Sequence, residues 1–210
     1  MIKHVIFDFD GTIADSKYLT AGIINDLAEK YNFQKIKKEE QEYFRSLSIL
    51  ERIKAIQLPV YLIPLIAAEV NIRYRKSVNT VPLVSGIDKA IQDLRVSGLK
   101  LSIMSSNSIT NINALFKKEN IVAFDNIYTS ANIFGKDMGI NLFLNRNRLK
   151  NDQVIYIGDE CRDIVACKKN NVKVIAVAWG YDSKERLAKE KPDYIVSSPS
   201  EITGIINSLM

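Results

Sequence analysis

The sequence predicts an α/β fold, with a mostly parallel sheet, helices on both faces, and a helical segment inserted after the first strand. Short apolar runs alternate with segments of helical period, which is the pattern of parallel strands joined by crossover helices. The alternation is interrupted once, because residues 16–80 contain no strand pattern. At 210 residues, the chain can bury one sizeable core, or a core with a small insertion.

Six short apolar runs, most of them rich in β-branched residues, predict the strands of this sheet. They lie at residues 5–7, 99–104, 127–129, 154–157, 172–178 and 194–196. Between several of them, apolar residues recur at helical spacing, and Gly98 follows the first such segment as a C-cap. The apolar faces of these helices are formed by Ile87, Ala90, Ile91 and Leu94, by Ile109, Ile112, Leu115 and Phe116, and by Ile164 and Val165.

The inserted segment is helical in its periodicity. Ile23, Ile24, Leu27 and Tyr31 fit one face of a helix, and residues 47–58 and 60–74 also have helical period, punctuated by Pro59 and Pro64. We therefore expect two domains, a core made of residues 1–15 and 81–210, and a helical domain made of residues 16–80.

Composition argues against several functional classes. The chain is 47% hydrophobic, no apolar run approaches the roughly 20 residues that span a bilayer, and the N-terminus lacks the pattern of a signal peptide. We expect a cytoplasmic protein without a membrane partner. The net charge of +5 is not gathered in arginine-rich or aromatic-interleaved stretches, which disfavours nucleic acid binding. Cys161 and Cys167 lack metal-ligand spacing, and the single histidine, His4, excludes multi-histidine metal sites.

Two aspartates, Asp8 and Asp10, follow the first strand directly. In a strand, residues i and i+2 point the same way, so both carboxylates face the crevice where open parallel sheets bind ligands. Gly11 then permits a tight turn whose N–H groups face an anion. Carboxylate oxygens suit Mg²⁺, although Asp-Gly is also an ordinary turn signal.

Three further strand ends carry polar groups. Ser105, Ser106 and Asn107 follow the second predicted strand, where a hydroxyl can bond a phosphoryl oxygen or simply cap a helix. Lys136 precedes a helix, and its ammonium can neutralise phosphate charge, although an isolated lysine is usually a surface residue. After the fourth predicted strand, Asp159 and Asp163 share a helix face, so one can reach a metal while the other braces Lys136.

In this order, the motifs resemble those of the haloacid dehalogenase-like hydrolases, nearest to the phosphoglycolate-phosphatase-like branch. They read "DFDGT" at residues 8–12, "SSN" at 105–107, "GK" at 135–136 and "GDECRD" at 158–163, and the resemblance covers residues 4–16 and about 83–204. It implies a Rossmann-like core with an α-helical cap at residues 16–80. It also implies Mg²⁺-dependent phosphoryl transfer through an aspartyl phosphate.

The resemblance assigns a role to each motif residue. Asp8 would be the nucleophile, and Asp10 the general acid and then base, with its backbone carbonyl on the metal. Asp8 and Asp159 would supply carboxylate ligands to Mg²⁺, with Asp163 and Glu160 in support. Ser106 and Lys136 would act on the phosphoryl group during catalysis. The groups expected to bind the substrate phosphate are Gly11, Thr12, Ser106, Asn107 and Lys136.

The expected activity is that of a phosphatase acting on a small phosphorylated metabolite, such as a phosphoglycolate-like compound or a sugar phosphate. A sugar-phosphate mutase shares these motifs, and a phosphonate hydrolase would use a nearby lysine such as Lys17. A non-catalytic phosphate-binding regulatory protein is the alternative from a different class. The expected assembly is a monomer or a homodimer. Five cations of the insertion are candidates to meet a second anionic group of the substrate: Arg45, Arg52, Lys54, Arg73 and Arg75.

Overall fold

A computed structural model describes residues 1–129 and 135–210, and its strands form one parallel sheet. The strand order is β3-β2-β1-β4-β5-β6, and every strand pair is parallel in the described part of the chain. The strands are β1 His4–Phe7, β2 Lys100–Ser105, β3 Asn126–Thr129, β4 Val154–Gly158, β5 Lys173–Val177 and β6 Tyr194–Val196. The predicted parallel α/β class is therefore confirmed, with strand ends displaced by at most one residue.

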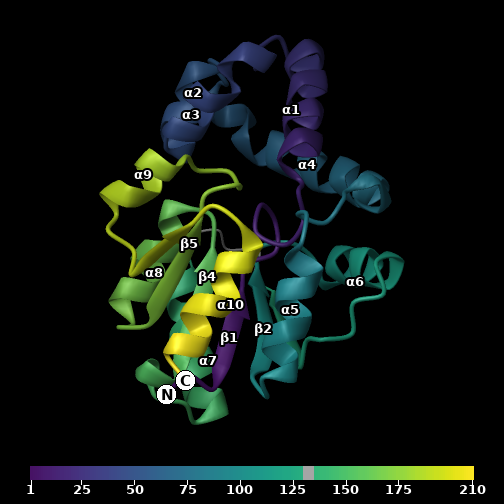
Figure 1. Cartoon of the computed structure of the whole chain (residues 1–210). Coiled ribbons are helices and arrows are strands. Elements are labelled where there is room, and N and C mark those ends of the chain that lie inside the picture. The colour runs from purple at the N-terminus through teal and green to yellow at the C-terminus, as the bar shows by residue number, and fades with distance from the viewer. Residues whose placement is uncertain (130–134) are drawn as a thin grey trace.

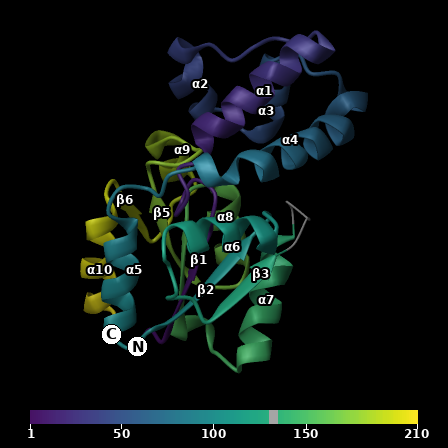
Figure 2. The ribbon, with the colours of Figure 1, turned by 90° about the vertical axis from the view of Figure 1, so that its right-hand side faces the viewer.

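Helices cover both faces of the sheet, because alternate strand residues point to opposite sides. Val5 and Phe7 of β1 join the cluster that includes the apolar faces of α5 (Ile87–Val96) and α10 (Pro199–Ser208). Ile6 joins a second cluster with α7 (Lys136–Asn147) and α8 (Cys161–Lys169). Figures 1 and 2 show the resulting three layers. The core helices are α5 Ile87–Val96, α6 Ile109–Lys118, α7 Lys136–Asn147, α8 Cys161–Lys169, α9 Lys184–Lys189 and α10 Pro199–Ser208.

Residues 16–80 form helices without a strand and lie beyond the carboxyl ends of the sheet strands (Figure 1). Their α-helices are α1 Lys17–Tyr31, α2 Gln41–Ser46, α3 Ile49–Ala55 and α4 Ile63–Ser77. The helix predicted at residues 47–58 is shorter than expected, since it begins after Ser48, whose hydroxyl accepts from the Glu51 N–H. Helices α2, α9 and α10 lie outside the predicted elements.

Among the described residues, no single helix is long and apolar enough to cross a membrane. The segments Ile49–Ala55 and Val60–Thr80 meet the length and composition requirement only as a pair, and they are bent by 116° with respect to each other.

The central strand β1 fixes where the site lies. Phe7 is paired with Ile103 of β2 and with Ile157 of β4, so the residues that follow these three strands emerge at the same edge of the sheet. The strand order also reverses direction at β1, which is the point where open α/β sheets form a ligand crevice. The motif residues that follow β1, β2 and β4 are therefore brought together by the register of the sheet.

Candidate active site

A buried lysine joins two acidic residues that are far apart in the sequence. Lys136 is the first residue of α7, and its Nζ donates to Asp8 Oδ2 at 2.6 Å and to Asp163 Oδ1. All three side chains are buried. Burial alone would lower the pKa of Lys136, but the carboxylates of Asp163 and Asp8 raise it well above its ordinary value. Lys136 therefore carries its positive charge at neutral pH.

Asp8 occupies the start of the loop that follows β1. Its Oδ1 accepts a hydrogen bond from the Phe9 N–H at 2.7 Å, and its own N–H donates to the carbonyl of Ile157 in β4. The main chain is thus anchored to the neighbouring strand, while one carboxylate oxygen meets Lys136. A carboxylate held in this way has a fixed orientation and is paired with an ammonium group, as a nucleophile requires.

Asp10 turns toward the helical insertion and accepts from three side chains. Its Oδ1 accepts from Ser16 Oγ at 2.8 Å and from Tyr74 Oη at 2.6 Å, and its Oδ2 accepts from Asn107 Nδ2 at 2.8 Å. Burial raises the pKa of Asp10, with Tyr74, Ser16 and Asn107 acting in the opposite direction and Asp8 reinforcing the increase. These opposing influences suit a group that exchanges a proton.

Asp159 follows β4 and packs against two glycines. Its Oδ1 accepts from Thr12 Oγ1 at 2.9 Å, and its Oδ2 accepts from the Tyr181 N–H at 2.7 Å. A Cβ atom at Gly11 or at Gly180 would lie 2.2 Å from Asp159, so a side chain at either position would displace this carboxyl group. Gly11 also has a φ of +76°, which L-residues rarely adopt. Both glycines are therefore required for the carboxyl group to sit where it does.

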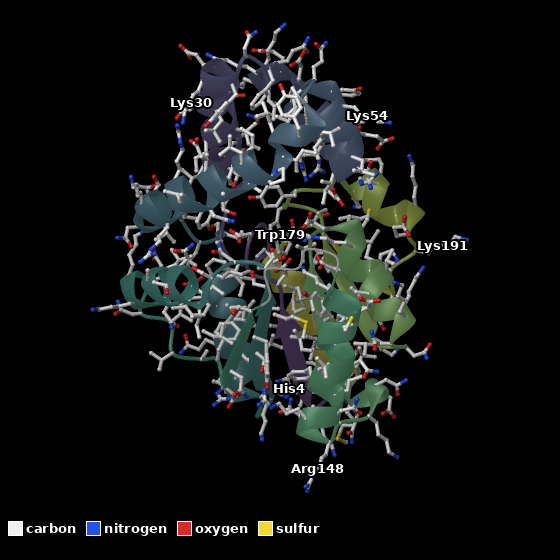
Figure 3. All side chains as sticks on the ribbon, turned by 180° about the vertical axis from the view of Figure 1, so that it is seen from behind. His4, Lys30, Lys54, Arg148, Trp179 and Lys191 are labelled. Carbon is white, nitrogen blue, oxygen red and sulfur yellow. The ribbon has the colours of Figure 1, made fainter. Side chains whose placement is uncertain are left out.

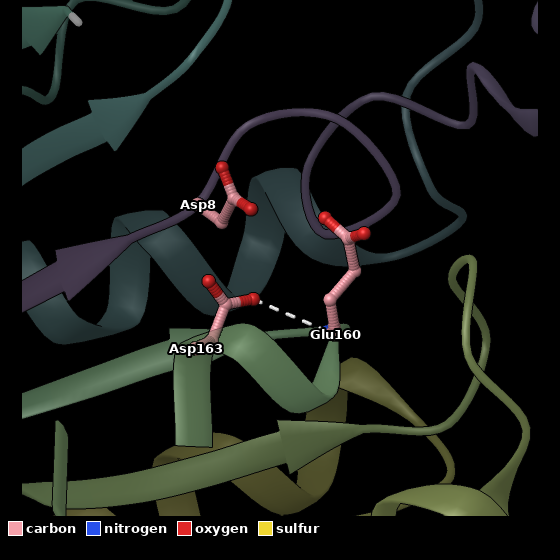
Figure 4. A group of neighbouring side chains, drawn as sticks. All are labelled: Asp8, Glu160 and Asp163. Carbon is pink, nitrogen blue, oxygen red and sulfur yellow. Dashed lines mark hydrogen bonds between the residues drawn. The ribbon is translucent and has the colours of Figure 1, made fainter. Parts of the chain in front are cut away.

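Three acidic side chains lie close enough together to share a metal ion. One carboxylate oxygen from each of Asp8, Glu160 and Asp163 lies within 4.8 Å of the others, and all three residues are buried (Figure 4). Asp163 Oδ2 also accepts from the Glu160 N–H at 3.1 Å, which fixes the start of α8. The donors are all oxygens, which is the ligand type that Mg²⁺ prefers.

The charges of this group support a cation site. Together with Asp159, the three acids make four carboxyl groups, and the cations that pair with them in the described residues are Lys136 and Arg162. Burial raises the pKa of Asp159 well above its ordinary value, and Glu160, Asp8 and Asp163 raise it further. Burial, with Asp8 and Glu160, likewise raises the pKa of Asp163 to about 6, although Lys136 opposes the change. A divalent cation would offset this excess of negative charge, so the residues fit one.

The expected phosphate-binding groups divide into two sets. Lys136 lies at the centre of the site, and half-buried Ser106 follows β2 at the same sheet edge. Within the described structure, Lys136 is engaged by Asp8 and Asp163, and the other three are engaged by further groups of the protein. The Gly11 N–H donates to the Ala14 carbonyl at 2.8 Å, the Thr12 hydroxyl binds Asp159, and the Asn107 side chain binds Asp10. Their positions favour a role in shaping the loop around Asp8.

Two cations expected to meet a second anion of the substrate instead hold the insertion to the core. Arg45 donates to the carbonyls of Gly180 at 3.0 Å and Ala178 at 2.6 Å. Arg52 donates to the Tyr181 carbonyl at 3.0 Å and pairs with Asp182 Oδ1 at 2.5 Å.

The remaining candidate cations are either exposed, as Lys54 and Arg75 are, or paired with other groups of the protein. Arg73 pairs with Asp26 and Glu69 on the surface of the insertion. Lys54 lies on the outer part of the insertion, far from Trp179 at its junction with the core (Figure 3). Lys17 donates to Asp15 Oδ1 at 2.8 Å and to the Trp179 carbonyl at 2.9 Å, so its ammonium is already bound.

Sequence reasoning missed two tyrosines of the site. Tyr74 reaches Asp10 from α4 of the insertion, and Tyr181 lies in the loop after β5, where its hydroxyl bonds Ser16 at 3.1 Å and Thr20 at 2.9 Å. Tyr181 carried a usable signal, because it follows a strand and a glycine at the sheet edge that holds the other motifs. Tyr74 lies within a helical pattern and carried none.

The chain is similar to known hydrolases over most of its length. The model of a family described as haloacid dehalogenase-like hydrolase matches residues 5–177. A phosphoglycolate phosphatase of Synechococcus elongatus is 26% identical over 210 residues, covering 100% of this chain and 99% of that protein. The pyrophosphatase PpaX of Listeria innocua is 23% identical over 220 residues, covering 98% of this chain and 96% of that protein.

Solved structures show the same fold. A structure described as a predicted phosphatase from Clostridium acetobutylicum has a TM-score of 0.85 at 21% identity and covers 99% of both chains. A haloacid dehalogenase-like hydrolase from Streptococcus pneumoniae has a TM-score of 0.84 at 22% identity and covers 98% of both chains. At sequence identities of 21% and 22%, these structures show that the fold is shared and nothing further.

Proposed function

The chain belongs to the haloacid dehalogenase-like hydrolase family, and from this premise we propose that it is a Mg²⁺-dependent phosphatase of small phosphomonoesters. The observation that carries the proposal is the buried Lys136, which binds Asp8 at 2.6 Å and also binds Asp163 at the carboxyl edge of the sheet. The names of the phosphoglycolate phosphatase and the pyrophosphatase among the relatives support the same class of reaction.

Asp8 is the proposed nucleophile. Its Oδ attacks phosphorus, so that an Asp8 O–P bond forms as the bond from phosphorus to the leaving alcohol oxygen breaks. Lys136 pairs with the Asp8 carboxylate and offsets the charge of the phosphoryl oxygens, while Ser106 lies at the sheet edge where its hydroxyl can donate to one of them. Water then attacks the phosphoryl group, which frees phosphate and restores the Asp8 carboxylate.

Asp10 is the proposed proton carrier for both steps. It gives its proton to the leaving alcohol oxygen and then takes a proton from the attacking water. The contacts from Ser16, Tyr74 and Asn107 fix the direction of its carboxylate. Tyr74 comes from the insertion, so we assign it as a positioning residue for Asp10.

The proposed metal ligands are the carboxylates of Asp8 and Asp159 and the Asp10 carbonyl, with Glu160 and Asp163 completing the acidic surroundings. A bound Mg²⁺ would stabilise the negative charge that develops on the transferring phosphoryl group. The protein's own contribution is to keep the carboxyl oxygens of Asp8, Glu160 and Asp163 close together and to bury these three residues and Asp159.

We also propose the division into a core, residues 1–15 and 81–210, and a cap, residues 16–80. The secondary structure of the cap is helical and contributes no strand to the sheet. The cap lies over the carboxyl edge of the sheet that holds the acidic group (Figure 2). In this role, the cap excludes water from the reacting groups and shapes the space for the alcohol part of the substrate.

The experiment that tests the activity measures phosphate release from p-nitrophenyl phosphate by the purified protein with Mg²⁺, Mn²⁺ or Co²⁺ and with a chelator. We expect release with a metal and none with the chelator. Absence of release with all three metals would contradict the proposal and favour a non-catalytic phosphate-binding protein. With a sugar phosphate as the substrate, transfer of the phosphoryl group to a second hydroxyl of the sugar, without release of phosphate, would indicate a mutase instead.

A further inference from the structure

A cavity of about 540 Å³ lies between the cap helices and the loop at Trp179–Tyr181. We call it the cap cavity. Its cap side is lined mainly by aliphatic and aromatic side chains, among them Ile24, Phe44, Ile53, Ile66 and Val70. Protein interiors are close-packed and rarely contain voids much larger than a water molecule, whereas ligand pockets occupy roughly 300–1,000 Å³. The cap cavity thus has the size and lining of a ligand pocket.

The cations that line the cap cavity are already bound by other groups of the protein. Lys17 binds Asp15 and the Trp179 carbonyl, and Arg45 binds Glu42 and core carbonyls. Arg52 binds Asp182. Among the lining residues, all of which the structure describes, no cation is therefore left for a carboxylate or a second phosphate. The lining favours an uncharged, apolar occupant.

Tyr181 connects the cap cavity with the acidic group. It lines the cavity, its N–H binds Asp159 at 2.7 Å, and its hydroxyl bonds Ser16 at 3.1 Å. Ser16 in turn donates to Asp10 at 2.8 Å. Asp10 is the group that protonates the leaving alcohol in the proposed reaction, and these bonds place the cap cavity on the Asp10 side of the acidic group.

We propose that the cap cavity receives the apolar, uncharged part of the substrate, and that the preferred substrates are monophosphates of apolar alcohols or phenols. This inference rests on the proposed phosphatase activity and narrows its substrate class. It also departs from the expectation that the cap presents arginines to a second anionic group, because Arg45 and Arg52 are bound to the core loop. A hydroxy-acid phosphate such as phosphoglycolate is then a poor substrate, since the cavity offers its carboxylate no partner.

The test uses straight-chain alkyl phosphates from ethyl to octyl, whose leaving alcohols differ little in acidity. We expect kcat/KM to rise roughly threefold to fourfold for each added methylene until the cavity is filled, as the transfer of apolar surface from water predicts. The affinity of the matching alkylphosphonates, which are not hydrolysed, should rise in parallel when measured by calorimetry. Phosphoglycolate should be hydrolysed more slowly than butyl phosphate.

Two neighbouring alanines of α4 supply a matched pair of variants. Ala67 lines the cap cavity, whereas Ala68 does not, and both are exposed. In Ala67→Leu, the gain in kcat/KM of octyl phosphate over ethyl phosphate, and the matching gain in affinity of octylphosphonate, should fall at least tenfold. Ala68→Leu should behave as the wild type with every compound.

These measurements distinguish failure of the cavity assignment from failure of the proposed phosphatase activity. Hydrolysis that does not improve with chain length, or an Ala67→Leu variant that retains the full gain, would overturn the assignment of the cavity while leaving the phosphatase activity intact. If no ester is hydrolysed, but phosphonate affinity rises with chain length and falls in Ala67→Leu, the proposed reaction fails and the apolar site stands. If neither hydrolysis nor a chain-length effect on binding is seen, both fail.

Discussion

Tyr74 of the cap donates its hydroxyl to Asp10 Oδ1 in the core over 2.6 Å. The two residues are 64 positions apart, and the bond joins helix α4 to the loop that follows the first strand. Asp10 also accepts from Ser16, where the chain enters the cap. The orientation of the proposed acid is therefore set by the position of the cap, so that proton transfer depends on the cap being in place.

Replacing Tyr74 by Phe should impair reactions that need a general acid. We expect kcat/KM for an alkyl phosphate to fall roughly tenfold, since a hydrogen bond to a charged group contributes about 1.5–3 kcal/mol. For p-nitrophenyl phosphate, whose leaving group departs without a proton, the change should be much smaller. Tyr61→Phe is the control, because Tyr61 is an exposed cap tyrosine. Equal losses on both substrates would contradict a role through Asp10.

Removal of the cation between Asp8 and Asp163 should be costly to the fold. Lys136→Met leaves both carboxylates buried without their partner, and we expect the free energy of unfolding to fall by about 3–5 kcal/mol in urea denaturation. Adding Asp163→Asn should recover part of the stability, because one of the two uncompensated charges is removed. Phosphatase activity should be lost in Lys136→Met and should not return in the double variant. A Lys136→Met variant that is as stable as the wild type would show that Lys136 does not form these buried ion pairs.

The proximity of Glu160 to Asp8 predicts that Glu160 contributes to metal binding. Glu160→Gln removes one charge from the acidic group, so Mg²⁺ affinity measured by calorimetry should fall about tenfold or more. Asp152→Asn removes a charge from an exposed residue just before β4, at the opposite edge of the sheet, and should leave the affinity unchanged. An unchanged affinity in Glu160→Gln would place the metal away from this residue.

The single histidine should make stability depend on pH. His4 is buried at the start of β1 and bonds Ser102 through Nε2 at 2.9 Å, and burial lowers its pKa to about 4 from an ordinary value of 6.5. The unfolded chain therefore binds the proton more readily between these two values. The free energy of unfolding should be fully retained above pH 6.5 and should fall as the pH drops toward 4, by at most about 3 kcal/mol for this group.

The matched variant for this pH dependence is His4→Gln, which retains a polar side chain but does not titrate. Urea unfolding at pH 7 and pH 4.5 should show a smaller loss of stability in His4→Gln than in the wild type. Carboxyl groups titrate in both proteins, so the difference between them isolates the histidine. Identical losses would show that His4 is not buried in its neutral form.

The polar ends of the strands could be predicted from sequence because their position follows from topology. Asp8, Ser106 and Asp159 each follow an apolar run, and parallel strands end at one edge of a sheet. Lys136 could be anticipated for a related reason, since it begins a helix at that edge. No knowledge of the distances between these residues was needed.

Other parts of the site depend on contacts that local pattern does not encode. Tyr74 meets Asp10 only because the C-terminal part of α4 comes back to the loop after β1. Arg45 and Arg52 meet backbone carbonyls in the loop after β5. A charged side chain on a helix gives no indication of whether a backbone carbonyl will bind it. Helix α10, in contrast, could have been found from Ser198, Pro199 and Glu201, which form a capping box with proline in the first turn.

In the proposed reaction Asp8 becomes phosphorylated, and borohydride trapping detects this intermediate. Enzyme quenched during turnover with Mg²⁺ and substrate is reduced with borohydride, which converts an aspartyl phosphate to homoserine, and peptide mass spectrometry locates the converted residue. We predict homoserine at position 8 in the wild type. In Asp8→Asn, which should remain folded by circular dichroism, we predict no homoserine and a turnover lower by on the order of 10³-fold or more. Homoserine at another position, or an Asp8→Asn variant with the wild-type rate, would show that Asp8 is not the nucleophile.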